Sequence, residues 1–262
     1  MTQFSPVAVL EPLRREPVKA GIFCDYDGTI AEIVEDPSQA WPLTGITEVL
    51  DRLASAYGRV AILSGRPVSF FSDLLPPSVV VSGLYGLESI IDGERHDHPQ
   101  GGAWREVIDD VVSIARAQGP EGMRVESKGL SLTLHYRGNP EIEPAVREFV
   151  KKQAERSGLV MRPARMSYEL HPPIAADKGT AVLDLAGELD AVLFIGDDVG
   201  DLPAFDALDA LAAEGRYTVR VAVRSPEESQ QMIARADFTV DGPAGVLHLL
   251  EQLLETSGRK AS

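Results

Sequence analysis

Residues 21–29 read Gly21-Ile22-Phe23-Cys24-Asp25-Tyr26-Asp27-Gly28-Thr29. A short apolar run, typical of a strand, here delivers two carboxylates into a turn. Asp has a low strand propensity, and two like charges at one strand end repel each other. A bound cation would remove this repulsion. We therefore interpret Asp25 and Asp27 as one metal-dependent site, with one carboxylate available as a nucleophile and the other as a proton carrier.

Three further apolar runs also end in small or polar residues. They are residues 59–63 before Ser64-Gly65-Arg66, residues 79–81 before Ser82-Gly83, and residues 191–195 before Gly196-Asp197-Asp198. Continuous apolar runs are expected of strands buried on both faces of a parallel sheet, and such sheets bind ligands at their carboxyl ends. Helical patterns at 43–57, 178–189, 201–214 and 242–253 alternate with these runs and with later strands at 217–223 and 238–240. The alternation predicts an α/β fold, a doubly wound parallel-sheet (Rossmann-like) domain.

The middle of the chain breaks this alternation. Helical patterns at 104–118 and 141–157 are each followed by two strand-like segments, at 123–127 and 130–137 and at 159–162 and 166–170. Gly101-Gly102 and Pro172-Pro173 are plausible hinges. We therefore predict a core domain from residues 1–102 and 174–262, with an inserted α+β cap domain at 103–173.

The amino-acid composition limits the classes of binding partner. The 262 residues carry a formal net charge of −15 without a block of Lys or Arg, which argues against nucleic acid or an anionic membrane as a partner. One cysteine, Cys24, allows no intramolecular disulfide and is expected to be buried. No apolar stretch approaches the roughly 20 residues of a membrane span, and the N-terminus does not resemble a signal peptide. We expect a cytoplasmic monomer.

The strand ends carry residues suited to phosphate chemistry. Carboxylates from two strand ends suit Mg²⁺, and the acidic set lacks the His or Cys expected for zinc. Ser64 offers a hydroxyl and Lys178 a positive charge for phosphate oxygens. Each group alone also fits a structural role: Lys178 could be a solvated helix start, and Asp198 could cap a helix near Asp201. Together they favour phosphoryl transfer, which depends mostly on positioning and charge neutralisation.

Four short motifs resemble those of the haloacid dehalogenase superfamily of phosphatases. They are Asp25-Tyr26-Asp27-Gly28-Thr29, Ser64-Gly65-Arg66, Lys178-Gly179 and Gly196-Asp197-Asp198 with Asp201. The resemblance implies that Asp25 is the nucleophile and forms an aspartyl-phosphate, that Asp27 is the acid and base, and that Ser64 and Lys178 hold the phosphoryl group. It further implies substrate contacts from Ser64, Gly65 and Arg66, and Mg²⁺ ligation by Asp25, Asp27 (through its backbone carbonyl), Asp197 and Asp198, with Asp201 close by.

The insert resembles a narrower family, the trehalose-6-phosphate phosphatases. The motifs are Glu126-Ser127-Lys128, His135-Tyr136-Arg137 and Glu169-Leu170-His171-Pro172. A disaccharide needs donors and acceptors in fixed positions, and Glu126, Lys128, Arg137 and Glu169 would supply them. Closing the insert over the core would exclude bulk water. Glu126 and Lys128 could instead form a surface pair, and Arg137 could lie on a solvated face. The chain departs from the family pattern at Tyr85, where a histidine is usual.

We therefore predict a phosphatase that converts trehalose 6-phosphate to trehalose and phosphate, in trehalose biosynthesis. The main alternative is a phosphatase of the same superfamily acting on another sugar phosphate or a glycosyl-phosphoglycerate. A non-enzymatic phospho-acceptor, such as a response-regulator receiver, would be about half this length and would lack both the insert and the second acid. A catalytically silent sugar-binding relative is disfavoured because no catalytic acid is missing.

Overall fold

The computed structural model describes residues 6–34, 36–164, 166–225 and 230–255. The chain forms two compact units. The first combines the segments up to His96 and from Ala176 onward, and the second is Asp97–Ala175. The sequence predicted the second unit at 103–173; its role as a cap domain stays a prediction.

The first unit contains an eight-stranded sheet with helices on both faces. Its strands are β1 (Ala20–Cys24), β2 (Arg59–Leu63), β3 (Val80–Gly83), β4 (Glu88–Ile91), β5 (Glu94–Asp97), β10 (Ala191–Gly196), β11 (Tyr217–Arg224) and β12 (Phe238–Asp241). Its helices are α1 (Pro6–Arg15), α2 (Ile46–Ala56), α5 (Lys178–Ala186), α6 (Leu202–Ala213), α7 (Gln230–Arg235) and α8 (Gly242–Leu254). Its short 3-10 helices are η1 (Pro17–Lys19), η2 (Pro37–Gln39), η3 (Val68–Phe71), η4 (Leu84–Gly86) and η7 (Val199–Asp201).

The strand order is β12-β11-β10-β1-β2-β3-β4-β5, which puts β1 between β10 and β2. The strands from β12 to β3 are parallel, whereas β4 runs antiparallel to β3. Cys24, the last residue of β1, lies opposite Ile195 of β10 and Ile62 of β2. The residues that follow these three strands therefore emerge at one edge of the sheet, where open α/β sheets bind ligands.

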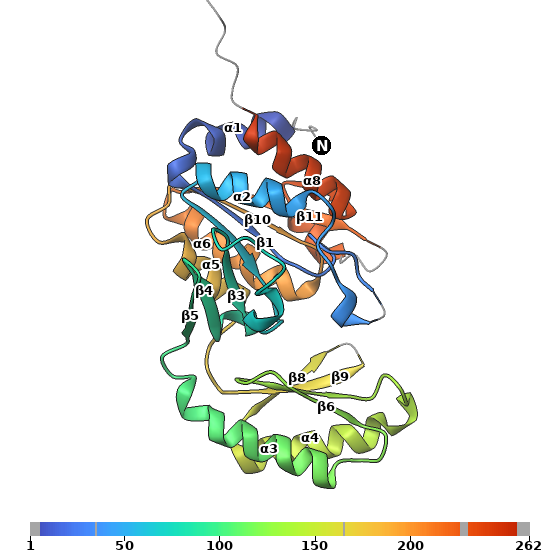
Figure 1. Ribbon diagram of the computed structural model, residues 1–262. Helices are drawn as coiled ribbons and strands as arrows, with labels where there is room; N and C mark the ends of the chain where they lie inside the picture. Colours follow the sequence, from blue (N-terminus) through green and yellow to red (C-terminus); the bar gives the residue numbers. More distant parts are fainter. Residues whose placement is uncertain (1–5, 35, 165, 226–229, 256–262) are drawn as a thin grey trace, which may run out of the picture. The chain divides into compact units, whose positions relative to one another are not determined.

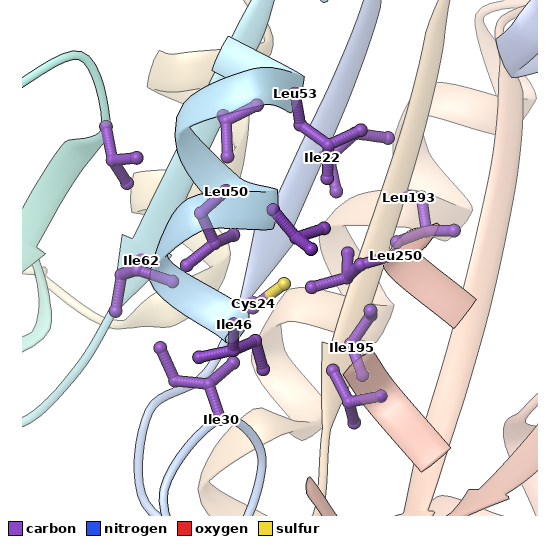
Figure 2. Close-up of a cluster of buried hydrophobic side chains, with 14 of the residues drawn as sticks. Ile22, Cys24, Ile30, Ile46, Leu50, Leu53, Ile62, Leu193, Ile195 and Leu250 are labelled. Carbon is purple, nitrogen blue, oxygen red and sulfur yellow. The ribbon is translucent and has the colours of Figure 1, made fainter. Parts of the chain in front are cut away.

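Alternating side chains of β1 enter the two halves of the core. Ile22 and Cys24 pack with α1, α2 and α8, whereas Phe23 packs with α5 and α6 on the opposite face. Figure 2 shows Ile22 and Cys24 among isoleucine and leucine side chains from α2, α8 and neighbouring strands. Cys24 is buried and unpaired, and burial raises the pKa of its thiol. Burial on both faces explains the continuous apolar run of β1, and the doubly wound core is confirmed.

The second unit is a four-stranded sheet with two helices on one face (Figure 1). Its elements are η5 (Gly102–Trp104), α3 (Arg105–Gln118), β6 (Arg124–Ser127), β7 (Leu132–His135), η6 (Pro140–Ile142), α4 (Glu143–Ser157), β8 (Val160–Ala164) and β9 (Ser167–His171). The antiparallel order is β6-β7-β9-β8. Leu132, Leu134 and Leu170 pack against α3 and α4, so the alternate residues of these strands belong to the other, polar face.

Four helices and strands of the first unit are not predicted from the sequence. β4 has only four residues, of which one is buried. α1 contains Pro12, which disfavours a helical prediction, yet Leu10 and Leu13 are buried in the core. β5 has four exposed residues and so lacks an apolar signal. α7 is only six residues long. Within the described ranges, no helix is long and apolar enough to cross a membrane.

Candidate active site

Three carboxylates meet at the carboxyl edge of the parallel sheet. Asp25 follows β1, and its backbone N–H donates to the Ile195 carbonyl of β10 at 2.8 Å. Asp197 follows β10, and Asp201 ends the short helix η7. One carboxylate oxygen from each of Asp25, Asp197 and Asp201 lies within 4.8 Å of the other two, and all three residues are buried. The parallel pairing of β1 and β10 therefore brings together acids that are more than 170 positions apart in sequence.

Lys178 enters this cluster from the first turn of α5. Its Nζ lies 2.6 Å from Asp25 Oδ1 and 2.6 Å from Asp201 Oδ1, and the residue is only 5% exposed. The start of α5 is fixed by Asp177, whose carboxylate accepts from the Thr180 backbone N–H at 2.8 Å. The Asp177 N–H in turn donates to Thr180 Oγ1 at 3.0 Å, which completes a capping box. The capped helix start thus presents the lysine to Asp25.

Asp201 organises the turn after β10. Its Oδ2 accepts from the backbone N–H groups of Asp197, at 3.0 Å, and Asp198, at 3.3 Å, while Oδ1 binds Lys178. The Asp198 carboxylate accepts from the Gly200 N–H at 2.8 Å. Both oxygens of Asp201 are therefore engaged by protein groups, and this residue braces the turn that carries Asp197.

The electrostatics of the cluster favour a cation. Burial raises the pKa of Asp25 well above its ordinary value; Lys178 opposes this shift, and Asp201 and Asp197 add to it. Burial, Asp201 and Asp198 raise the pKa of Asp197 to about 7. Burial lowers the pKa of Lys178, but Asp201 and Asp25 outweigh that effect and hold it well above its ordinary value, so the ammonium is charged. Its single positive charge cannot offset the whole group of carboxylates.

The shape of the cluster also fits a metal ion. Gly28 has φ +80°, and a Cβ on this residue would lie 2.1 Å from Asp197 Oδ2. The turn thus leaves room for the Asp197 carboxylate beside Asp25. The cluster offers oxygen ligands only, which suits a hard divalent cation such as Mg²⁺.

Asp27 lies outside this buried cluster and is paired with Arg66. Arg66 Nε donates to Asp27 Oδ2 at 2.7 Å, and Nη2 donates to Oδ1 at 2.6 Å. Arg66 Nη1 donates to the Pro37 carbonyl at 2.7 Å, and the guanidinium lies 4.1 Å from the centre of the Phe70 ring. The structure therefore gives Arg66 a set of protein partners that orient Asp27. The predicted contact of Arg66 with substrate stays a prediction.

A cavity of about 130 Å³ opens beside Asp25. Its lining residues are Asp25, Asp27, Ser64, Gly65, Tyr85, Lys178, Asp198 and Gly200. Ser64 is buried, and its backbone N–H donates to the Ser82 carbonyl of β3 at 2.9 Å. The volume is enough for one phosphoryl group. The cavity is therefore lined by the predicted nucleophile Asp25, by the predicted acid and base Asp27, and by Ser64 and Lys178. Tyr85 lines it too, although its sequence context marked it only as a departure from a family pattern.

The polar face of the second unit carries three of the predicted sugar-binding residues. Glu126 of β6, Thr133 of β7, Glu169 of β9 and Arg162 of β8 are cross-strand neighbours in one row. Lys128 Nζ lies 3.7 Å from Glu169 Oε1. The row combines two carboxylate acceptors, a hydroxyl and a guanidinium donor.

Neighbouring side chains hold the carboxylates of this row. Ser131 Oγ donates to Glu169 Oε1 at 2.8 Å, and His135 Nε2 lies 2.7 Å from Glu126 Oε2. Arg137, the fourth predicted residue, is exposed two positions beyond the end of β7. Thr133 and Arg162 were not predicted, because their membership of the row depends on strand register.

Comparison with known proteins identifies the family. The model of the trehalose-phosphatase family matches residues 23–243, which include every site residue named in this subsection. The chain belongs to this family. Trehalose-phosphate phosphatases of Mycobacterium leprae and Mycobacterium ulcerans are each 32% identical to it, over 88% and 93% of its length. The chain spans only 57% and 62% of those relatives' own lengths.

Solved structures share the fold. A trehalose-6-phosphate phosphatase related protein matches with a TM-score of 0.75 and 24% identity, covering 89% of this chain and 97% of the other. The C-terminal domain of the Candida albicans trehalose-6-phosphate phosphatase matches with a TM-score of 0.73 and 24% identity, covering 95% and 97%. A phosphatase of the haloalkanoate enzyme superfamily from Bacteroides thetaiotaomicron matches with a TM-score of 0.55 and 16% identity, covering 89% and 94%. The α/β fold predicted from the alternation of strand-like and helical segments is thus confirmed.

Proposed function

We propose that this chain is a Mg²⁺-dependent phosphatase that hydrolyses trehalose 6-phosphate to trehalose and phosphate. The observation that carries the proposal is the convergence of Asp25, Ser64 and Lys178 on one phosphate-sized cavity, in a chain of the trehalose-phosphatase family. The curated relatives of that name support the substrate.

Asp25 is suited to act as the nucleophile. A carboxylate oxygen of Asp25 attacks phosphorus, the bond between phosphorus and the sugar oxygen breaks, and an aspartyl-phosphate forms. Ser64 and Lys178 hold the oxygens of the transferring group. The Lys178 ammonium, 2.6 Å from Asp25 Oδ1, keeps the nucleophile oriented and reduces repulsion between the carboxylate and the incoming phosphate.

Asp27 is suited to move the proton. It donates a proton to the departing sugar oxygen, which would otherwise leave as an unstable alkoxide. It then takes a proton from a water molecule that attacks the aspartyl-phosphate, so that phosphate is released and Asp25 is restored. Arg66 fixes the orientation of Asp27 through two hydrogen bonds to its carboxylate.

Asp25, Asp197, the Asp27 backbone carbonyl and Asp198 are the proposed holders of Mg²⁺, and Asp201 fixes the turn that presents Asp197. When bound, the ion would neutralise charge on the phosphate and on the acidic cluster.

Glu126, Lys128, Arg137 and Glu169 are proposed to bind the sugar. The first, second and fourth lie on the polar face of the second unit, where Glu169 is held by Ser131 and Lys128. For compartment and assembly we propose a cytoplasmic monomer, as expected from the sequence.

A substrate panel tests the proposal. We expect phosphate release from trehalose 6-phosphate to exceed that from glucose 6-phosphate, sucrose 6-phosphate and glucosyl-3-phosphoglycerate in kcat/KM. Equal rates on trehalose 6-phosphate and glucose 6-phosphate would contradict the assigned substrate. Preference for another member of the panel would support the alternative phosphatase of the same superfamily.

A further inference from the structure

Tyr85 is held at the phosphate-sized cavity by an uncommon backbone conformation. It lies in η4, between Leu84 and Gly86, and all three residues have positive φ: +48°, +60° and +98°. L residues with side chains rarely adopt this region, and such conformations persist where the surroundings fix them. Leu84 is 1% exposed and belongs to the packed interior. Tyr85 is half-buried and lines the cavity, so burial in the core does not account for its placement.

Hydrogen bonds tie this turn to the loop that carries Ser64. The Tyr85 N–H donates to the Ser64 carbonyl at 3.1 Å, and the Leu84 N–H donates to the Arg66 carbonyl at 3.0 Å. On its other side, η4 packs against α5, the helix that begins with Lys178. The backbone of Tyr85 is therefore set between the two elements that present Ser64 and Lys178.

The ring of Tyr85 reaches back over Gly65. A Cβ on Gly65 would lie 2.6 Å from both Cζ and Oη of Tyr85. No side-chain-bearing residue at position 65 could keep this contact, since real Cβ atoms do not approach so closely. The hydroxyl end of the ring thus lies against the glycine that follows Ser64, and Gly65 and Tyr85 both line the cavity.

We propose that Tyr85 is a phosphate-binding residue whose hydroxyl donates a hydrogen bond to an oxygen of the phosphoryl group in this cavity. Asp25 and Lys178 approach the cavity from β1 and α5, and Tyr85 supplies a neutral donor from the side of Gly65. A neutral donor at this position assists anion binding without adding a further charge to the acidic cluster. This inference rests on the proposed phosphatase function.

The test measures binding of orthovanadate, a phosphate mimic, in the presence of Mg²⁺, together with turnover of trehalose 6-phosphate. Tyr85→Phe keeps the ring and removes only the hydroxyl. Because a hydrogen bond to a charged group is lost, we expect vanadate to bind roughly ten-fold more weakly, with a similar loss in kcat/KM. Tyr57→Phe is the matched control: Tyr57 donates its hydroxyl to the Leu253 carbonyl, outside the cavity. The Tyr57→Phe variant should bind vanadate as tightly as the parent protein.

A double-mutant cycle tests the contact itself. Gly65→Ala should weaken vanadate binding in the parent protein, because the new methyl group displaces the Tyr85 ring. In the Tyr85→Ala background the same change should cost much less, since the ring that it would displace is gone. Additive losses would overturn the contact, and Tyr85→Phe with unchanged vanadate binding would overturn the donor role.

The two proposals fail in different ways. A parent protein that binds vanadate through Tyr85 but does not hydrolyse any sugar phosphate would refute the proposed function alone. Normal turnover with a fully active Tyr85→Phe variant would refute only the role of Tyr85.

Discussion

The surroundings of Asp25 destabilise its charged carboxylate form. It is buried among acids, and its pKa is raised by burial and by Asp201 and Asp197, with Lys178 as the opposing partner. A carboxylate destabilised in this way gains from contact with a cation, which favours its charged form. Burial and repulsion of this kind are common among functional residues, in line with the proposed role of Asp25 as the nucleophile.

Asp25→Asn should abolish turnover while the fold is kept. The amide cannot attack phosphorus, so we expect kcat for sugar phosphate to fall by more than about 10³-fold. Removing one of several buried acids relieves repulsion, so the metal-free variant should melt no lower than the parent protein. Phosphate release and thermal melting check the two expectations. Substantial residual hydrolysis would exclude Asp25 as the nucleophile.

Arg66 contributes through Asp27. Arg66→Ala removes both hydrogen bonds to the Asp27 carboxylate, so the proton carrier loses its fixed orientation. We expect a loss of roughly 10²-fold in kcat on trehalose 6-phosphate and a smaller loss on 4-nitrophenyl phosphate, whose leaving group needs no proton. Arg66→Lys retains the charge but not the two hydrogen bonds to Asp27. This variant should also lose more kcat on trehalose 6-phosphate than on 4-nitrophenyl phosphate. Equal losses on both substrates would instead support direct binding of Arg66 to the phosphate.

At the scale of the element, the ends of strands and helices position the site. β1 and β10 place Asp25 and Asp197 side by side through parallel pairing, and the capped start of α5 places Lys178. The helix ends are held by side chains next to the site residues, namely Asp177 for α5 and Asp198 for η7.

Asp177→Ala tests the capping box of α5. It leaves the Thr180 N–H without its acceptor, and the loss of a helix N-cap costs about 1 kcal/mol of unfolding free energy. Asp177→Ser retains a capping oxygen and should restore most of that stability. Urea denaturation of the two variants measures the difference. Equal stability of the alanine variant and the parent protein would show that the cap does not stabilise α5.

At the scale of the whole molecule, the proposed function requires an acidic protein to bind an anionic substrate. With a net charge of −15, the chain would repel a phosphorylated sugar unless positive charge is concentrated locally. Lys178 supplies one such charge inside the cavity, and the carboxylate cluster would supply a second by holding a divalent cation.

Metal dependence should appear in activity and in stability. EDTA should stop phosphate release and Mg²⁺ should restore it, whereas turnover that resists the chelator would contradict the metal assignment. In the metal-free protein, the pKa of Asp197 is about 7, above its ordinary value of about 3.9. Between these two pH values the folded state holds a proton that the unfolded chain has released, so stability falls as the pH rises through this window.

Mg²⁺ bound by these acids would replace that proton, so the effect of Mg²⁺ on stability should depend on pH. We expect Mg²⁺ to raise the melting temperature more at pH 7.5 than at pH 5, because protonated carboxylates bind the ion poorly. Melting curves with EDTA and with excess Mg²⁺ at both pH values provide the test. A pH-independent shift would argue against binding at these acids.

The second unit should govern the choice of sugar. Glu126→Ala removes an acceptor from the polar row of β6, β7, β9 and β8, so we expect a larger loss in kcat/KM on trehalose 6-phosphate than on 4-nitrophenyl phosphate. Arg116→Ala on α3 lies on the helical side of the same unit and serves as a surface control. Equal losses on both substrates would show that this face does not recognise the sugar.

The amino-acid sequence alone determined the order of the main elements, the doubly wound core and the positions of the acids. Continuous apolar runs mark strands buried on both faces, and polar residues can follow such strands only at the sheet's ligand-binding edge. Local patterns suffice for these features because they depend on neighbouring residues. α1, with Pro12, and β5, with its exposed residues, were missed because tertiary contacts stabilise them.

Only the tertiary structure decided how the site residues pair. In the folded chain, Arg66 forms hydrogen bonds to the Asp27 carboxylate, and the Asp201 carboxylate accepts a hydrogen bond from the backbone N–H of Asp197. The tertiary structure also set the Tyr85 ring over Gly65 and aligned Glu126 with Thr133, Glu169 and Arg162. These contacts join loops and strands that are distant in sequence, and they depend on strand register and on backbone conformation in turns. The sequence pattern predicts that polar groups lie at the edge of the sheet. The distances between these groups are set by tertiary packing, which the pattern does not specify.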